Sequence, residues 1–109
     1  MARRNYEIDQ GATFDRVYQW IDVDGQPINL TDWTIRASMR PNYTSSQVTN
    51  FGTELSSPVS GTFRLVMNAT ASVSLSAGMY VYDVLAYDGA DVRRIMEGTI
   101  LLRPMVTRI

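Results

Sequence analysis

The side chains that could carry chemistry in this chain are carboxylates, hydroxyls and arginines, because its 109 residues include no histidine, cysteine or lysine. General acid–base catalysis relies first on histidine, and covalent catalysis relies on cysteine, lysine or a serine activated by a base. Two pairs of acids have the spacing of candidate glycosidase carboxylates, Glu7 with Asp9 and Asp88 with Asp91. Both pairs fall in predicted strand edges or turns, where solvated acids are usual. We therefore expect no enzymatic activity and no catalytic residues.

One segment resembles the beginning of a calcium-binding loop. Asp22, Asp24 and Gly25 have the initial spacing, but such a loop needs a further oxygen donor and then a bidentate glutamate. Gln26 and Pro27 break the pattern at the next positions. A tight turn explains the segment better, so we expect neither a metal site nor a cofactor.

Length, composition and charge limit which other classes of function are compatible with the chain. The length fits a single domain spanning residues 1–109, and 45% apolar and 10% aromatic residues are typical of a globular protein. Ten basic residues, all arginine, against eleven acids give a net charge of −1, which argues against broad binding to nucleic acid or anionic membrane. No stretch has the length of a membrane span, and Met1–Gln10 lacks the apolar centre of a signal peptide. We expect synthesis in a cytoplasm, and without cysteine the stability of the fold should not depend on redox state.

Apolar and polar residues alternate along most of the chain, which predicts β-strands. In Trp33–Arg40, for example, the odd-numbered residues are apolar and the even-numbered ones polar. The predicted strands are Thr13–Val23, Ile28–Leu30, Trp33–Arg40, Val48–Leu55, Thr62–Met67, Met79–Tyr87 and Val92–Leu102. About seven strands at this spacing predict an all-β, immunoglobulin-like antiparallel β-sandwich.

The connections give further expectations. Pro41–Gln47 is polar and should be the longest exposed loop, and Asn68–Leu75 should contain one helical turn capped by Asn68 or Thr70. Asp24-Gly25 and Asp88–Asp91 should form turns, and Gly98 should mark a bulge in the last strand.

A more specific signal lies around Tyr80. A turn with a small residue, Gly78, precedes it, and Tyr82 follows at an expected inward position. This spacing matches the tyrosine corner of immunoglobulin-like sandwiches, in which the phenol bonds to upstream backbone. Tyr82 would then take the place of the disulfide cysteine, with Trp33 or Trp20 as the large core aromatic. A buried tyrosine pair in another β fold is the open alternative.

Exposed aromatic side chains can stack on sugar rings, so they suggest a second function class. Tyr18, Trp20, Trp33, Tyr80 and Tyr82 lie on the inward faces of strands and are expected in the core. Outside that set, Tyr43 lies in the long loop and Tyr87 ends a strand. A carbohydrate-binding module therefore stays open as an alternative, although we do not expect glycan binding.

The two ends of the chain hold the candidate interface residues, which are Arg3, Arg4, Tyr6, Arg103 and Arg108. Terminal segments are usually disordered unless something holds them, and edge strands without lysine need another form of protection. We therefore expect Met1–Tyr6 and Arg103–Ile109 to contact other protein chains. Deleting Met1–Asn5 or Thr107–Ile109 should leave the isolated domain folded.

Four phrases carry a family resemblance by their order and spacing. They are Ile8-Asp9-Gln10-Gly11-Ala12-Thr13-Phe14; Asp24-Gly25-Gln26-Pro27 followed by Leu30-Thr31-Asp32-Trp33-Thr34; Ala77-Gly78-Met79-Tyr80-Val81-Tyr82-Asp83-Val84; and Glu97-Gly98 with Pro104 and Val106-Thr107-Arg108. Together they resemble small virion proteins of tailed bacteriophages with an immunoglobulin-like fold, similar to the amino-terminal domain of phage baseplate upper proteins.

The resemblance implies a structural component of a virion, in the tail, baseplate or fibre-attachment region. It implies other virion structural proteins as partners, with multiple copies in a symmetric assembly, and it provides no catalytic residues. A receptor-binding or fibre region often follows this domain in the relatives, whereas this sequence ends at Ile109. Capsid decoration as a cement protein therefore remains an alternative.

Overall fold

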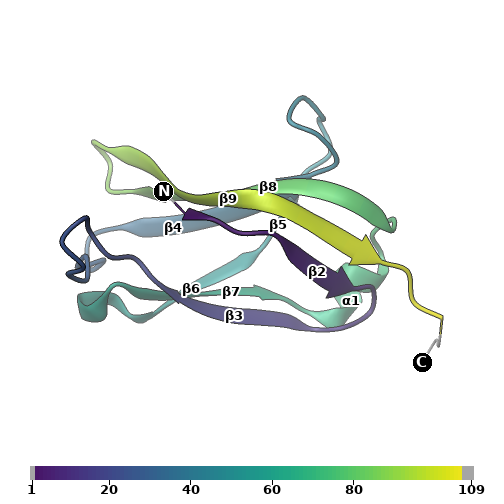
Figure 1. The fold of residues 1–109 in the computed structure, drawn as a ribbon, viewed down its shortest axis with the longest axis horizontal. Coiled ribbons are helices and arrows are strands. Elements are labelled where there is room, and N and C mark those ends of the chain that lie inside the picture. Colours follow the sequence, from purple (N-terminus) through teal and green to yellow (C-terminus); the bar gives the residue numbers. More distant parts are fainter. Residues whose placement is uncertain (1, 107–109) are drawn as a thin grey trace.

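Alternating apolar side chains build two β-sheets that pack face to face in the computed structural model, which describes residues 2–106 (Figure 1). The larger sheet contains β1 (Ala2–Arg3), β2 (Tyr6–Asp9), β4 (Thr34–Arg40), β5 (Thr49–Asn50), β8 (Gly78–Tyr87) and β9 (Val92–Arg103). The smaller sheet contains β3 (Phe14–Gln19), β6 (Gly52–Ser57) and β7 (Thr62–Met67). A 3-10 turn, η1 (Pro58–Ser60), and one short helix, α1 (Ala69–Val73), connect strands at opposite ends of β7.

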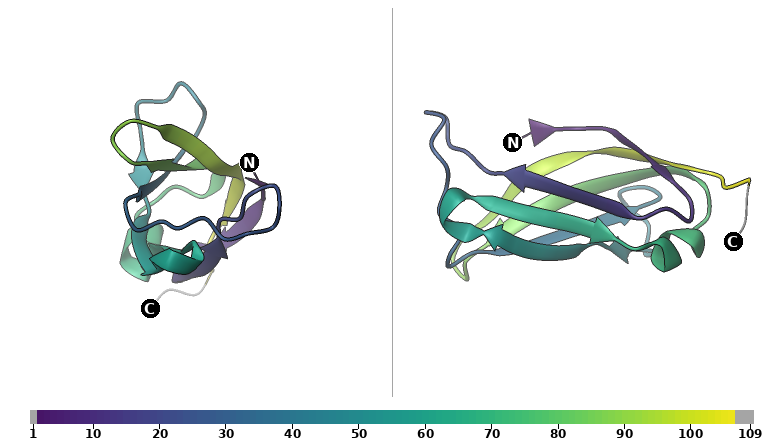
Figure 2. Two further views of the ribbon diagram at one scale, coloured as in Figure 1. Left: turned by 90° about the vertical axis from the view of Figure 1, so that its left-hand side faces the viewer. Right: turned by 90° about the horizontal axis from the view of Figure 1, so that it is seen from below.

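The strand order confirms the predicted sandwich. The larger sheet runs β1-β9-β8-β4-β5, with β2 also on β9, and the smaller runs β3-β7-β6. This is the strand arrangement of an immunoglobulin-like fold. Because β1 and β2 are two halves of one edge strand, the nine strands occupy eight positions rather than about seven. That edge strand runs parallel to β9, so the larger sheet is mixed and not purely antiparallel. Figure 2 shows the two layers from two further sides.

The core lies between the sheets and follows the alternation that the sequence predicts. Strand β7 buries Phe63, Leu65 and Met67, and β4 buries every second residue from Ile35 to Met39. Such alternation allows one face of each strand to exclude water while the other stays solvated. The predicted inward faces of these two strands are therefore confirmed.

Two of the predicted turns are confirmed in detail. The carboxylate of Asp22 accepts hydrogen bonds from the backbone N–H groups of Asp24 and Gln26, so this segment is a tight turn. Asn68 caps α1, since its side-chain oxygen accepts a bond from the N–H of Ala71 at 2.8 Å.

Four local predictions are wrong. Ile28–Leu30 is not a strand, because the chain there makes only an isolated bridge between Ile21 and Pro27. The longest segment between named strands is consequently residues 20–33, not the loop of residues 41–47. The predicted strand Val48–Leu55 is divided at Phe51, where the chain leaves one sheet for the other. The bulge in β9 lies at Ile95, which is skipped in the pairing with β8, whereas Gly98 pairs regularly.

The two tryptophans occupy a different place from the one expected. Trp20 and Trp33 are only partly buried and pack against each other edge to face, with ring centroids 5.4 Å apart. The aromatic rings nearest to Tyr82 include Tyr6, at 6.0 Å between centroids. The large aromatic beside Tyr82 is therefore a tyrosine from the N-terminal strand and not a tryptophan.

No helix within residues 2–106 is long and apolar enough to cross a membrane.

Candidate functional site

The N-terminal segment, predicted to be an interface, is an edge strand of the protein's own sheet. Ala2 and Arg3 pair with Met96 and Glu97 of β9, and Tyr6–Asp9 pair with Ile100–Arg103 in the same parallel direction. Contacts within the chain therefore hold this terminus, and no neighbouring subunit is needed to explain its order. Residues 2 and 3 therefore belong to the folded sheet, which the predicted tolerance to deletion of Met1–Asn5 did not take into account.

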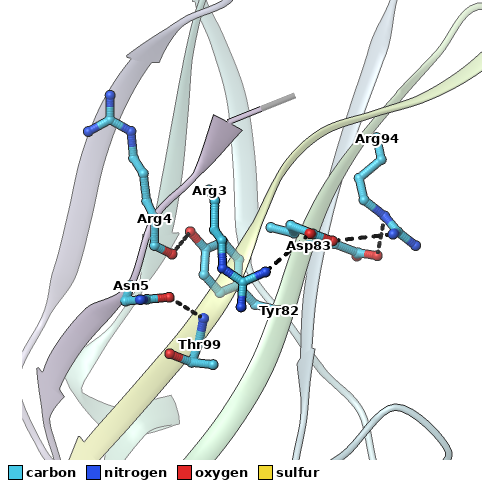
Figure 3. Close-up of polar contacts among 8 residues, drawn as sticks. Arg3, Arg4, Asn5, Tyr82, Asp83, Arg94 and Thr99 are labelled. Carbon is cyan, nitrogen blue, oxygen red and sulfur yellow. Dashed lines mark hydrogen bonds and ion pairs between the residues drawn. The ribbon is translucent and has the colours of Figure 1, made fainter.

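Side chains bridge the point where this edge strand is interrupted, between β1 and β2 (Figure 3). The N–H of Arg4 donates to the carbonyl of Glu97 at 3.0 Å, and the carbonyl of Arg4 accepts the hydroxyl of Tyr82 at 2.7 Å. The side-chain oxygen of Asn5 accepts the N–H of Thr99 at 3.0 Å, as a main-chain carbonyl would in a continuous strand. The interruption therefore leaves these backbone groups paired.

Gly98 permits this close approach. A Cβ atom added at Gly98 would lie 1.8 Å from the carbonyl oxygen of Arg4 and 2.7 Å from its carbonyl carbon. Both atoms belong to the backbone, so a side chain there would have to displace the N-terminal strand. The glycine that suggested a bulge is thus explained by the passage of a neighbouring backbone.

Charged side chains run across the outer face of the larger sheet beside this strand (Figure 3). Arg94 contacts both Asp83 at 3.4 Å and Glu97 at 3.3 Å, and Glu97 also contacts Arg3 at 3.4 Å. Most of these groups are substantially solvent-exposed, so each pair adds little stability. They place Arg3, one of the predicted interface residues, at one end of this row of charges.

The other end of the edge strand pairs with Arg103. The guanidinium of Arg103 lies 3.4 Å from Glu7 and 3.9 Å from Asp9. The acid pair that had the spacing of glycosidase carboxylates therefore faces an arginine on an exposed edge. Of the remaining predicted interface residues, Arg4 lies at the interruption between β1 and β2, Tyr6 begins β2, and Arg108 lies outside the described residues.

Three tyrosines connect the edge strand to both sheets. The hydroxyl of Tyr18 on β3 donates to that of Tyr6 at 2.5 Å, and the rings of Tyr6 and Tyr82 are neighbours. Burial raises the pKa of Tyr18, and its hydrogen bond to Tyr6 raises it further. Burial likewise raises the pKa of Tyr82. Both phenols stay protonated near neutral pH, so they serve as hydrogen-bond donors: Tyr18 joins the two layers, and Tyr82 joins β8 to the edge strand within the larger sheet.

The tyrosine corner is confirmed. Tyr80 is 8% exposed, and its hydroxyl donates to the backbone carbonyl of Ser76 at 2.6 Å. Gly78 begins β8 with a φ of +143°, in a region that favours glycine. Tyr82, two residues after Tyr80, is buried at the position predicted for it, and its hydroxyl reaches Arg4.

The turn that follows β2 is fixed to α1 and to the segment after β9. The side chain of Gln10 donates to the carbonyl of Leu75 at 2.7 Å and accepts the N–H of Met105 at 3.2 Å. The hydroxyl of the fully buried Ser72 accepts the N–H of Gly11 and donates to the carbonyl of Ala12, both at 2.9 Å. Segments far apart in the sequence thus meet at one end of the sandwich.

The surface has grooves, one of which lies between the N-terminal strand and β3. It has a volume of about 700 Å³, and its lining includes Arg4, Tyr6, Arg16, Val17 and Ile95. Arg16 lies with its guanidinium 5.4 Å from the ring centre of Phe14. The groove combines apolar surface with two arginines that make no ion pair within residues 2–106.

Tyr43, the candidate sugar-stacking residue, is 73% exposed in the loop after β4. It lines a groove of about 330 Å³ whose other aromatic lining residue, Tyr82, is buried. Tyr87 is half-buried, and the guanidinium of Arg36 lies 6.0 Å from the centre of its ring. Within residues 2–106, Tyr43 is the one aromatic side chain that is mostly exposed, so it has no adjacent ring with which to form a platform.

The other acidic pair forms part of a turn. The carboxylate of Asp88 accepts the N–H groups of Ala90 and Asp91, and these bonds hold its pKa below the ordinary value of 3.8. Asp91 instead contacts Arg93 at 3.8 Å. No three acidic side chains of the described chain gather in the way that a metal site requires.

The sequence patterns do not point to Asn5 and Thr99, which help to fix the edge strand, and they assign Gly98 to a bulge and not to this contact. A signal for the strand was present, because Tyr6 and Ile8 alternate with two acids in the pattern of a half-buried strand. Comparison of the chain with protein-family models and with curated proteins gives no match.

Proposed function

We propose that the chain is a non-enzymatic structural component of a tailed-bacteriophage virion, in the tail, baseplate or fibre-attachment region. It would act by binding other virion structural proteins through its sheet edges and terminal segments, in several copies. The sequence phrases given above are the source of this proposal, and the sandwich fold agrees with the domain that they resemble.

The observation that carries the proposal is that parts of these phrases meet in the fold, since Tyr82 and Asp83 of the third phrase pair with Gly98 and Glu97 of the last. Gln10, in the first phrase, bonds to Leu75 just before the third phrase and to Met105, which lies between Pro104 and Val106 of the last. The sulfur of Met105 also lies where a side chain on Gly11 would be, 2.6 Å from an added Cβ. Contact between distant phrases is expected if they are the signature of one shared domain, whereas unrelated matches would scatter over the surface.

Residue composition supports a binding role over catalysis. Without histidine, cysteine or lysine, the chain has none of the groups most often used for acid–base or covalent chemistry near neutral pH. The carboxylates that remain as candidates are engaged in pairs with arginine or in a turn. Both observations fit a domain that binds other proteins and catalyses no reaction.

A density map of whole particles tests the proposal. Mass spectrometry should first detect the chain in purified virions, and the map should then locate the sandwich at the tail, baseplate or fibre attachment. Absence from particles would refute the proposal, and a position on the head would replace it with capsid decoration. Glycan binding that Tyr43→Ala abolishes would instead favour a carbohydrate-binding module.

A further inference from the structure

One of the four sheet edges is long, regular and uncovered within the described chain. The β5 edge has two residues, and the edge formed by β1 and β2 is interrupted and closed by side chains. The β6 edge has an irregularity between Glu54 and Ser57 and continues into Pro58. By contrast, β3 pairs with β7 without interruption from Phe14 to Gln19. Short, broken or bulged edges resist addition of another strand, whereas a straight edge invites it.

The register shows which backbone groups of β3 face outward. The N–H of Trp20 donates to the carbonyl of Gly61, so this pair is hydrogen-bonded across β3 and β7. Because bonded and non-bonded pairs alternate in an antiparallel ladder, Phe14, Arg16 and Tyr18 also bond to β7. The N–H and C=O groups of Asp15, Val17 and Gln19 therefore point away from β7, toward the open edge.

We propose that β3 pairs with β3 of a second copy of this chain, antiparallel and across a two-fold axis, with Val17 opposite Val17. The two smaller sheets would then form one continuous sheet. The inference concerns the isolated chain and does not depend on the proposed virion role.

The side chains on the solvent face of β3 are complementary in this register. Val17, whose side chain is 59% exposed, would cover its own counterpart. Asp15 would lie opposite Gln19 of the other copy at both ends, so that the amide donates to the carboxylate. Cross-strand pairs of this kind are stabilising, whereas like charges placed opposite each other are destabilising.

The inner face of β3 selects the same register. Arg16 would lie opposite Tyr18 of the other copy, where the guanidinium can contact an aromatic ring. The groove beside β3 leaves room for these side chains on that face. If the two-fold axis passed through residue 16 and not through residue 17, Arg16 would lie opposite Arg16 of the other copy. Charge repulsion therefore disfavours this alternative, and a shift in the other direction would lose the pairs between Asp15 and Gln19.

Sedimentation of the purified chain over a range of concentrations gives the first test. The mass should rise from that of one chain toward that of two. Val17→Pro removes the outward N–H and leaves the ladder with β7 intact, as is tolerated on an edge strand. It should abolish dimerisation, whereas Val17→Thr, which keeps the N–H and the branched side chain, should retain it. Urea titration should show that both variants are folded.

Opposite charge changes at Gln19 give a test of the register. Gln19→Asp places two acids opposite each other at both ends of the pair and should weaken the dimer roughly tenfold. Gln19→Arg places an arginine opposite Asp15 and should strengthen it. Gln19→Asp also removes the side-chain N–H that donates to the Ser60 carbonyl, whereas arginine keeps N–H donors, so urea titration should show that both variants are folded.

Thiol cross-linking locates the axis, since the chain has no cysteine of its own. In the proposed register the two Cα atoms of residue 17 would lie about 5.5 Å apart. Val17→Cys should therefore cross-link rapidly with a short bifunctional thiol reagent. Val59→Cys should not, although Val59 is also exposed, because it lies on η1. A single-chain mass at every concentration, a dimer that survives Val17→Pro, or equal cross-linking at both positions would overturn the proposal.

Discussion

Replacing Gly98 with alanine tests whether the N-terminal strand is an integral part of the sandwich. The added methyl group would lie 1.8 Å from the carbonyl oxygen of Arg4, which is too close for any real contact. Since β9 is held by β8 along its whole length, the N-terminal strand is the part that must move.

The size of the effect follows from the hydrogen bonds at that point. Displacing residues 4 and 5 breaks the bond from Arg4 to Glu97, the bond from Thr99 to Asn5 and the bond from Tyr82 to Arg4. At about 1 kcal/mol each, these contribute about 3 kcal/mol to the free energy of unfolding. Replacing glycine restricts the unfolded chain and returns about 0.5–1 kcal/mol. We therefore expect a net loss of about 2 kcal/mol.

Urea titration and limited digestion with trypsin measure the two consequences. The denaturation midpoint of Gly98→Ala should fall, and cleavage after Arg3 and Arg4 should become faster as their segment detaches. Gly52→Ala is the matched control, because its added Cβ meets its nearest atom at 3.4 Å, an ordinary contact. If Gly98→Ala has the midpoint and the trypsin resistance of the unaltered chain, the N-terminal strand does not lie against β9.

Three further results are expected. Tyr80→Phe should lower the free energy of unfolding by about 1 kcal/mol in urea titration, because the hydrogen bond from the buried tyrosine to the Ser76 carbonyl is lost. An unchanged midpoint would count against the tyrosine corner. Deleting Met1–Asn5 should lower the thermal midpoint measurably, since β1 is lost together with the Arg4 carbonyl that accepts the hydroxyl of Tyr82. An unchanged midpoint would show that residues 1–5 do not contribute to stability. The Arg64 guanidinium, through its hydrogen bonds, lowers the pKa of Asp15 below 3.8, so this pair stabilises the fold above that pH and the effect is lost as pH falls through the lowered value. In Arg64→Gln, an NMR titration should show the pKa of Asp15 rising toward its ordinary value, and no rise would contradict the pairing.

Local patterns in the sequence predict much of this fold. The alternation in Thr62–Met67 matches β7 residue for residue, because one face of that strand is buried along its whole length. Asn68 caps α1 and Tyr80 bonds to upstream backbone as predicted, since both interactions span only a few residues. Signals of this kind depend on neighbours in the sequence, which is why they can be found without a structure.

Long-range contacts explain what the sequence did not predict. The edge strand at residues 2–9 pairs with residues more than 90 positions away, so no turn sequence between the two strands predicts the pairing. The passage at Phe51 from one sheet to the other keeps the alternation intact and is invisible to periodicity. The sequence indicates that Gly98 has a special role, but the glycine is needed because the backbone of Arg4 passes beside it, and only folding brings these two residues together.

The parallel edge strand also determines how the domain would respond to force. Ala2 lies beside Met96 and Asp9 beside Arg103, so the start of β1 and the end of β9 are at opposite ends of the paired segment (Figure 1). Tension applied through the two chain ends would pull these strands past each other along their length. The hydrogen bonds between them would share the load in shear and fail together, whereas a hairpin pulled at its open end loses its bonds one after another. A sandwich joined into a chain of proteins through its two ends would therefore resist stretching.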